Sequence, residues 1–535
     1  MTTTPGGGSR LMLGFEGFAV GPAFRDLLAE TGARSVILFA RNITCAEQCK
    51  DLILELRASV PWPLLVAVDQ EGGAVVRLTR GATVFPGNMA LGAAADPQLA
   101  FEVGRASGRE LAAIGFDLNL APVVDLQTNP LNPGIGIRSF GADRSLATDL
   151  AEAFVRGHAE SGVACCLKHF PGKGAASVDA HLDLPVLDLE LSEFREPHVR
   201  IFEDSFARLE GCDPCVMTTH VIVRGLDPDL PATLSPRVVN GFLRGDLGFD
   251  GLVIADDLEM GAIEKHGSVA EAALGAAIAG HDVLPVCHRP DRQREAARLL
   301  DAAIADGRLD AEAHARACAR MARHSARRAS SSPSTSPSTS NVGPLGLDLE
   351  AGARVARTVA ERAFTVLADP GGLLPIRTDD RVLVLAARPH AVVGVEEVAD
   401  RDWSGLVFGA FESAGARPPV VRDFDLETLG REPHATCGRL LEGANEFVRV
   451  VLLSWNASFS EPMRRLLETV CAAVPDRLVV VHLRNPFDQA LVPATVTAVT
   501  NYGYRVAHIE ALAKGLLGAF DAQGRMPAPI RPVPN

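Results

Sequence analysis

The first half of the chain alternates short apolar runs with amphipathic segments long enough to form helices. Eight runs have the length and composition of buried strands: 11–15, 35–40, 64–68, 118–124, 163–167, 215–219, 252–255 and 282–286. The clearest helical segments between them are 23–31, 46–58, 100–114, 145–161 and 269–279. Eight strand–helix alternations predict a (β/α)8 TIM-like barrel, although a doubly wound open sheet would give a similar pattern.

Polar residues follow five of these runs at the point where each strand ends. They are Asp69 and Glu71, Asp125, Lys168 and His169, His220, and Asp256 and Asp257. In a barrel the carboxyl ends of all strands surround one pocket, whereas in an open sheet they spread along a line. Any one of these residues could be a cap or a turn residue. Together they favour a barrel with an active site at this face.

The length of 535 residues exceeds one ordinary domain. We predict a barrel domain over residues 1–325, which a helical segment at 309–328 closes. A Ser/Pro/Thr-rich linker follows at 326–345. Strand–helix alternation resumes in 346–535, with strands at 381–386, 448–453, 478–483 and 498–501, which predicts a second α/β sandwich domain.

Charge and composition narrow the class of protein. The net charge of −14 argues against nucleic acid or an anionic membrane as the main partner. The sequence has neither a signal-peptide pattern nor an apolar run of about 18 residues, so we expect a cytoplasmic protein. The ten cysteines are scattered, and Cys212 and Cys215 have no second pair or His partner. They predict reduced thiols and no metal site.

The segment 168–174, Lys-His-Phe-Pro-Gly-Lys-Gly, leads from the fifth strand into a loop that carries Asp179 and His181. Asp179 is close enough in sequence to accept a hydrogen bond from one ring nitrogen of His181, which leaves the other for proton transfer. A solvated loop would explain an isolated Asp-x-His. The position of this Asp-x-His after a strand end, in a glycine-bounded loop, favours a catalytic role for the pair.

This Lys-His-Phe-Pro-Gly-x-Gly and Asp-x-His signature resembles that of the β-N-acetylhexosaminidases of glycoside hydrolase family 3. The resemblance extends into the second domain at 361–367, 374–376, 485–488 and 524–527, but 400–443 matches no recognisable pattern. Three residues depart from the family pattern: Lys173 replaces His, Ala180 replaces Ser, and Ala255 replaces Ser or Thr.

The resemblance implies a catalytic set. The segment 251–260 resembles the family's nucleophile segment, in which Asp256 would attack the anomeric carbon. His181 would be the general acid/base, with Asp179 orienting it. We expect Asp257 to point away from the pocket and cap the following helix. The alternative is that both aspartates are helix caps.

The resemblance also implies a sugar-binding set, made of Asp69, Arg77, Arg138, Lys168 and His169. Arg77 could instead form an ion pair with Glu71. We expect the Lys173 ammonium on the leaving-group side, where it would favour an acceptor with a carboxylate or phosphate, unless it points to solvent. Asp125 and His220 are expected to support the site; Glu71, Met217 and Asn119 are assigned to the scaffold.

These features predict a retaining, exo-acting β-N-acetylglucosaminidase that removes terminal GlcNAc from small soluble glycosides or muropeptides, without a cofactor. A β-glucosidase of the family is a rival, but such enzymes take a carboxylate acid/base from the second domain and lack the Asp-x-His loop. A phosphorylase is another, because a His acid/base would not repel phosphate. A non-catalytic sugar-binding homologue is supported only by the three departures. The sequence predicts no oligomeric state.

Overall fold

The computed structural model describes residues 5–180, 182–265, 267–330, 345–391, 394–396 and 402–530. An eight-stranded parallel sheet forms the centre of the first domain, in the order β10-β1-β2-β3-β4-β5-β7-β9. A bridge between Ile254 and Val283 joins β9 to the residue before β10, so the sheet curves round into a barrel. The strands are β1 (Leu11–Leu13), β2 (Ser35–Leu38), β3 (Leu65–Val68), β4 (Leu118–Asn119), β5 (Ala164–Phe170), β7 (Cys215–Thr218), β9 (Val253–Ile254) and β10 (Leu284–Val286). Each overlaps one predicted run, and β5 extends beyond its run to Phe170, which confirms the predicted barrel.

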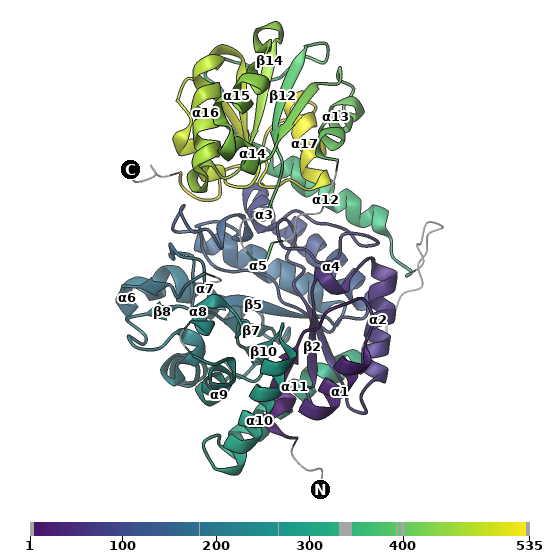
Figure 1. The fold of residues 1–535 in the computed structure, drawn as a ribbon, viewed down its shortest axis with the longest axis vertical. Coiled ribbons are helices and arrows are strands. Elements are labelled where there is room, and N and C mark those ends of the chain that lie inside the picture. The colour runs from purple at the N-terminus through teal and green to yellow at the C-terminus, as the bar shows by residue number, and fades with distance from the viewer. Residues whose placement is uncertain are drawn as a thin grey trace.

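Helices surround this sheet (Figure 1). Their ends carry ordinary capping signals: Asp96 and Ser268 accept hydrogen bonds from the first turns of α4 and α9, and Gly280 ends α9 with a positive φ. The described helices of the first domain are α1 (Pro22–Thr31), α2 (Ala46–Ala58), α3 (Asn88–Ala94), α4 (Pro97–Ile114), α5 (Arg144–Ala159), α6 (Leu191–Phe194), α7 (Arg200–Arg208), α8 (Gly261–Glu264), α9 (Val269–Ala279), α10 (Pro290–Ala305) and α11 (Ala311–Ser330). No helix in the described ranges combines the length and apolarity needed to cross a membrane.

The interior of the barrel is a separate apolar cluster to which every strand or its flanking residue contributes. It is therefore a packed core and not a channel. Four of its members, Ile37, Leu120, Met217 and Cys287, also line the cavity described below. The upper layer of the core thus forms the apolar floor of that cavity.

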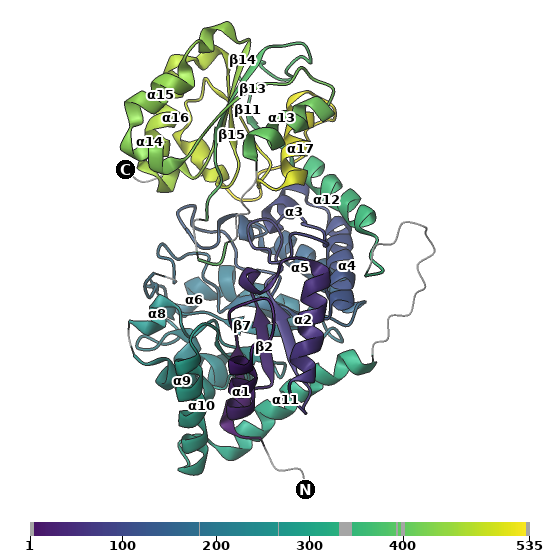
Figure 2. The ribbon, with the colours of Figure 1, turned by 45° about the vertical axis from the view of Figure 1, so that its right-hand side comes forward.

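The second domain contains a six-stranded sheet in the order β11-β16-β15-β14-β12-β13. Only β11 is antiparallel to its neighbour among the described strands. Figure 2 shows α13 (Trp403–Ser413) and α17 (Val506–Leu516) on one face and α14 (Leu426–Arg431), α15 (Pro433–Leu441) and α16 (Glu461–Ala473) on the other. The strands are β11 (Thr365–Ala368), β12 (Val382–Ala387), β13 (Val420–Phe424), β14 (Arg449–Ser454), β15 (Leu478–His482) and β16 (Thr497–Thr500). The predicted sandwich is confirmed. Strands β11 and β13 were not predicted, and neither was the small sheet of β6 (Val186–Leu187) and β8 (Ile222–Val223) in the first domain.

The two domains are in direct contact (Figure 1). Helix α12 (Leu349–Ala363) packs on α3 and α4, and Arg505 Nε donates to the carbonyl of Gly73 at 2.7 Å. Helix α11 continues to Ser330, inside the range predicted as linker, and residues 331–344 lie outside the described ranges. The domain boundaries at 325 and 346 therefore stay a prediction.

Candidate active site

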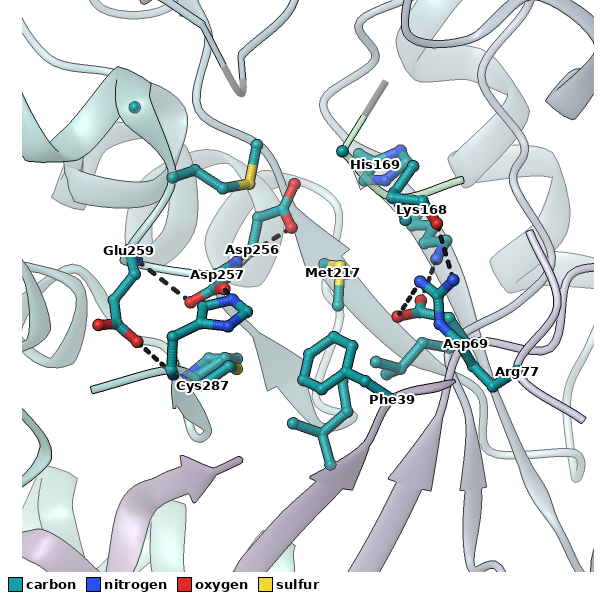
Figure 3. Close-up of a pocket in the computed structure, with 18 of the residues that line it drawn as sticks. Phe39, Asp69, Arg77, Lys168, His169, Met217, Asp256, Asp257, Glu259 and Cys287 are labelled. Atoms are coloured by element: carbon teal, nitrogen blue, oxygen red, sulfur yellow. Dashed lines mark hydrogen bonds and ion pairs between the residues drawn. The ribbon is translucent and has the colours of Figure 1, made fainter. Parts of the chain in front are cut away.

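A cavity of about 530 Å³ opens at the carboxyl ends of the barrel strands. Figure 3 shows two sides that face each other across an apolar floor. We call the side with Asp69, Arg77, Lys168 and His169 the β3–β5 wall, and the side with Asp256, Asp257 and Glu259 the β9 wall. The cavity brings together seven of the nine predicted site residues: Asp69, Arg77, Arg138, Lys168, His169, Lys173 and Asp256.

The β3–β5 wall is held by a buried charge network. Lys168 Nζ lies 2.8 Å from Asp69 Oδ1 and 2.7 Å from Glu71 Oε1. Arg138 binds Glu71 through two hydrogen bonds, of 2.9 and 2.8 Å. Burial favours the neutral acid, but Arg138 and Lys168 outweigh it and lower the pKa of Glu71 to about 2. Glu71, which the sequence analysis assigned to the scaffold, thus fixes two of the predicted sugar-binding cations in place.

Asp125 fixes the loop that follows β5. Its Oδ2 lies 2.7 Å from His169 Nδ1 and accepts from the His169 amide at 3.1 Å, while its Oδ1 accepts from the Lys173 amide at 2.6 Å. Burial raises the pKa of Asp125, which Lys173 opposes. A single buried carboxyl therefore sets both the His169 ring orientation and the backbone position of Lys173.

The second domain supplies part of the cavity wall through Gly394 and Val395. Arg77 Nη1 donates to the Val395 carbonyl at 2.8 Å, and its Nη2 lies 3.7 Å from Asp69 Oδ2. The alternative pairing of Arg77 with Glu71 is therefore wrong. Next to Val395, Glu396 forms a buried ion pair with Arg484, which follows β15. This contribution was not predicted from the sequence, because no motif surrounds residues 394–396.

The β9 wall carries the two adjacent aspartates. Asp256 Oδ2 lies 3.6 Å from Lys173 Nζ, and Asp256 Oδ1 accepts from the Asp257 amide at 3.0 Å. The expectation that Asp257 points away and caps a helix is wrong. Asp257 lines the cavity with its Oδ2 2.8 Å from His288 Nε2, and α8 begins only after Met260. That hydrogen bond raises the pKa of His288.

The predicted Asp179–His181 loop is attached to the chain beyond Asp256. The Ala180 carbonyl accepts from the Ala262 amide at 3.0 Å, and the buried Ala180 side chain packs in a small cluster with Met260 and Ala262. Asp179 is also buried. His181 lies outside the described residues, so the predicted pairing of Asp179 with His181 stays a prediction. The small, apolar surroundings of Ala180 account for an alanine at this position.

Several cavity residues were missed by sequence reasoning. Arg41 lies over the Phe39 ring, 4.3 Å from its centroid, and both come directly after β2. His288 follows β10 in the same way. Arg41 and His288 follow the predicted runs 35–40 and 282–286, so a position after a strand end was the signal that could have found them, whereas Phe39 lay inside the first of these runs. Met217 carried no such signal, because an apolar residue in a strand is ordinarily core.

We expect Glu71→Gln to destabilise the barrel by about 3–5 kcal/mol at pH 7, because it leaves Lys168 and Arg138 buried beside a neutral group. Since the folded-state pKa of about 2 is below the ordinary 4.5, the stabilisation by Glu71 is complete above pH 4.5 and is lost as the pH falls towards 2. Urea denaturation should therefore show that the difference in free energy of unfolding between wild type and variant becomes smaller below pH 4.5. Glu312→Gln, at an exposed site on α11, is the matched control and should change little. A constant gap would contradict the charge assignment.

The chain is similar to known proteins in both sequence and fold. The model of the Glycosyl hydrolase family 3 N terminal domain matches residues 14–324. The chain belongs to glycoside hydrolase family 3. A family 3 β-N-acetylglucosaminidase of solved structure from Paenibacillus sp. str. FPU-7 is 36% identical, with 98% of each chain covered and a TM-score of 0.89.

Two relatives named beta-hexosaminidase support the same assignment. That of Stenotrophomonas maltophilia (strain K279a) is 38% identical over 284 residues, which are 52% of this chain and 83% of the relative. That of Pseudomonas aeruginosa (strain LESB58) is 38% identical over 297 residues, 55% of this chain and 86% of the relative. The family 3 chain is therefore a glycoside hydrolase, and the resemblance noted in its sequence is confirmed.

Proposed function

We propose that this family 3 enzyme is a retaining, exo-acting β-N-acetylglucosaminidase that removes terminal β-linked GlcNAc from small soluble glycosides. The observation that carries the proposal is the placement of Asp256 opposite the Asp69–Lys168 pair across one cavity. A carboxylate on one side and fixed hydroxyl-binding groups on the other suit a sugar ring held with its anomeric carbon towards Asp256.

In the first step, a carboxylate oxygen of Asp256 forms a bond to the anomeric carbon while the bond to the aglycone oxygen breaks. His181 gives its proton to that oxygen, and Asp179 orients the imidazole. In the second step His181 takes a proton from water, the water oxygen bonds to the anomeric carbon, and the ester bond to Asp256 breaks. Configuration is retained because the carbon is attacked twice from opposite sides.

Recognition of the sugar is assigned to the β3–β5 wall. Asp69 would accept hydrogen bonds from hydroxyl groups of the sugar, and Lys168, Arg138 and His169 would donate hydrogen bonds to its hydroxyl oxygens. Arg77 and Val395, joined by a hydrogen bond, line the cavity on this side, and a boundary formed by them would suit a terminal sugar and therefore exo action. The apolar floor around Met217 would receive the acetamido methyl group.

Three further parts of the proposal concern cofactors, cellular location and the acceptor. Every step uses the chain's own side chains, so no metal or nucleotide is required. The described cysteines form no disulfide bond with one another, which is typical of a cytoplasmic protein. An acceptor with a carboxylate, such as a muropeptide, suits the lysine beside Asp256.

The proposal is tested by comparing kcat/KM for aryl β-GlcNAc and aryl β-glucoside substrates with the same leaving group, with and without phosphate. We expect the GlcNAc substrate to be preferred by about 10- to 100-fold, because its acetamido group fills a pocket that glucose leaves empty. Equal rates would indicate a β-glucosidase. Absence of aglycone release with either sugar would indicate a sugar-binding protein. Phosphate-dependent release would indicate a phosphorylase.

A further inference from the structure

Lys173 is fixed at the catalytic centre and does not extend into solvent. Its amide donates to Asp125 at 2.6 Å, and its carbonyl accepts from Asn132 Nδ2 at 2.7 Å. Its side chain is only 10% exposed and lines the cavity. The expectation that it could point to solvent is therefore wrong, and the ammonium lies 3.6 Å from Asp256 Oδ2.

The carboxylates around Lys173 differ in their distance from its ammonium group and in their other ion pairs. Among the described residues, Asp256 is the only carboxylate within 4 Å of Lys173 Nζ. Asp125 and Asp179 act on Lys173 from further away, and Arg138 opposes them. Asp125 is already engaged by His169. The ionic partner of Lys173 is thus the same carboxylate that the proposed mechanism converts to an ester.

We propose that Lys173 selects an acceptor with an anionic group in the second half of the reaction. The inference rests on the proposed function. In the free enzyme Lys173 is paired with ionised Asp256, so it offers little attraction to an anion. When Asp256 forms the ester, its negative charge disappears and the buried ammonium is left without that partner. An entering phosphate or carboxylate then takes the place of the Asp256 carboxylate as the ionic partner of Lys173, at the step in which an acceptor is needed.

The transfer step balances for either kind of anion. With phosphate, a phosphate oxygen bonds to the anomeric carbon, the ester bond to Asp256 breaks, and the electron pair returns to the Asp256 carboxylate, giving a sugar 1-phosphate. With a hydroxy acid, the hydroxyl oxygen attacks and loses its proton to His181, while the carboxylate lies beside Lys173. In both cases the Lys173–Asp256 pair is restored. The burial that lowers the pKa of Lys173 makes this replacement more favourable, because an isolated buried ammonium is costly.

The test measures how the glycosyl-enzyme divides between acceptors. An activated aryl β-GlcNAc glycoside is supplied with lactate or with 1,2-propanediol at constant ionic strength. The two have similar size and share a secondary hydroxyl, and only products formed at that hydroxyl are compared, because the diol also has a primary hydroxyl. A separate arm contains inorganic phosphate and scores sugar 1-phosphate against free sugar. Products are quantified for wild type, Lys173→Met, Lys173→Gln and Lys173→Arg, with Lys50→Met on α2 as the matched control.

We expect wild type to prefer lactate to 1,2-propanediol, and the preference to fall about fivefold in Lys173→Met and Lys173→Gln. Lys173→Arg and Lys50→Met should keep it. The phosphate arm shows whether a free anion or an anionic substituent is the better acceptor. An equal ratio in wild type and either neutral variant would overturn the inference, as would a wild type without preference for any anion. Failure of aglycone release would instead overturn the proposed function, so the two failures are distinguishable.

Discussion

Asp256→Asn should lower turnover of an aryl β-GlcNAc glycoside by about 10⁴-fold or more, with GlcNAc still bound. The amide keeps the size and most contacts of the side chain but cannot form the ester. Binding depends mainly on the β3–β5 wall, on the other side of the cavity, and should survive. Steady-state kinetics together with calorimetric titration of GlcNAc measure the two effects separately.

The neighbouring carboxylate provides the control. Asp257→Asn retains a hydrogen-bonding partner for His288 and should reduce turnover by only about tenfold. A 2-fluoro sugar with a good leaving group should trap the intermediate and label Asp256, which peptide mass spectrometry would locate. Labelling of Asp257, or a larger loss in Asp257→Asn than in Asp256→Asn, would reverse the assignment of the nucleophile.

The contrast between these two aspartates shows where sequence reasoning ends. Asp256 and Asp257 follow a strand of alternating side chains, and alternation predicts that one faces away from the cavity. In the structure β9 ends at Ile254, so neither aspartate belongs to the strand. The loop turns both side chains to the cavity, and His288 after β10 supplies the partner for Asp257. The pairing of Asp257 with His288 could not be predicted from the local sequence, because the two residues lie far apart in the chain.

Features that depend on chain periodicity were predictable from sequence, and features that depend on buried electrostatics were not. Periodic apolar runs located all eight barrel strands and brought Asp69, Lys168 and Asp256 to one face. Glu71 looked like scaffold because its role arises from Arg138, which lies 67 positions away. Val395 was missed for a similar reason, since its backbone carbonyl, and not its side chain, meets Arg77.

The His181 proposal makes an expectation that depends on the leaving group. His181→Ala should slow the first step by about 10²–10⁴-fold for alkyl and sugar aglycones, which need a proton to depart. Nitrophenyl aglycones leave as stable anions, so their release should be affected much less. Pre-steady-state measurement of aglycone release across a series of leaving-group pKa values gives the dependence directly, and its slope should steepen in the variant.

The second step offers an independent measure of the same residue. Without His181, water loses its general base, but azide requires none, so azide should partly restore turnover where breakdown of the intermediate limits the rate. Asp179→Asn is the companion variant, and it should show a weaker form of both effects, because the imidazole remains but loses its orienting charge. Met260→Leu, which keeps the apolar contact with Ala180, should show neither effect. If His181→Ala slowed good and poor leaving groups equally and azide had no effect, the histidine would hold the loop in place without transferring a proton. Any preference of the intermediate for an anionic acceptor would then have to be tested with the Lys173 variants alone, because Lys173 would be the remaining group able to attract that acceptor.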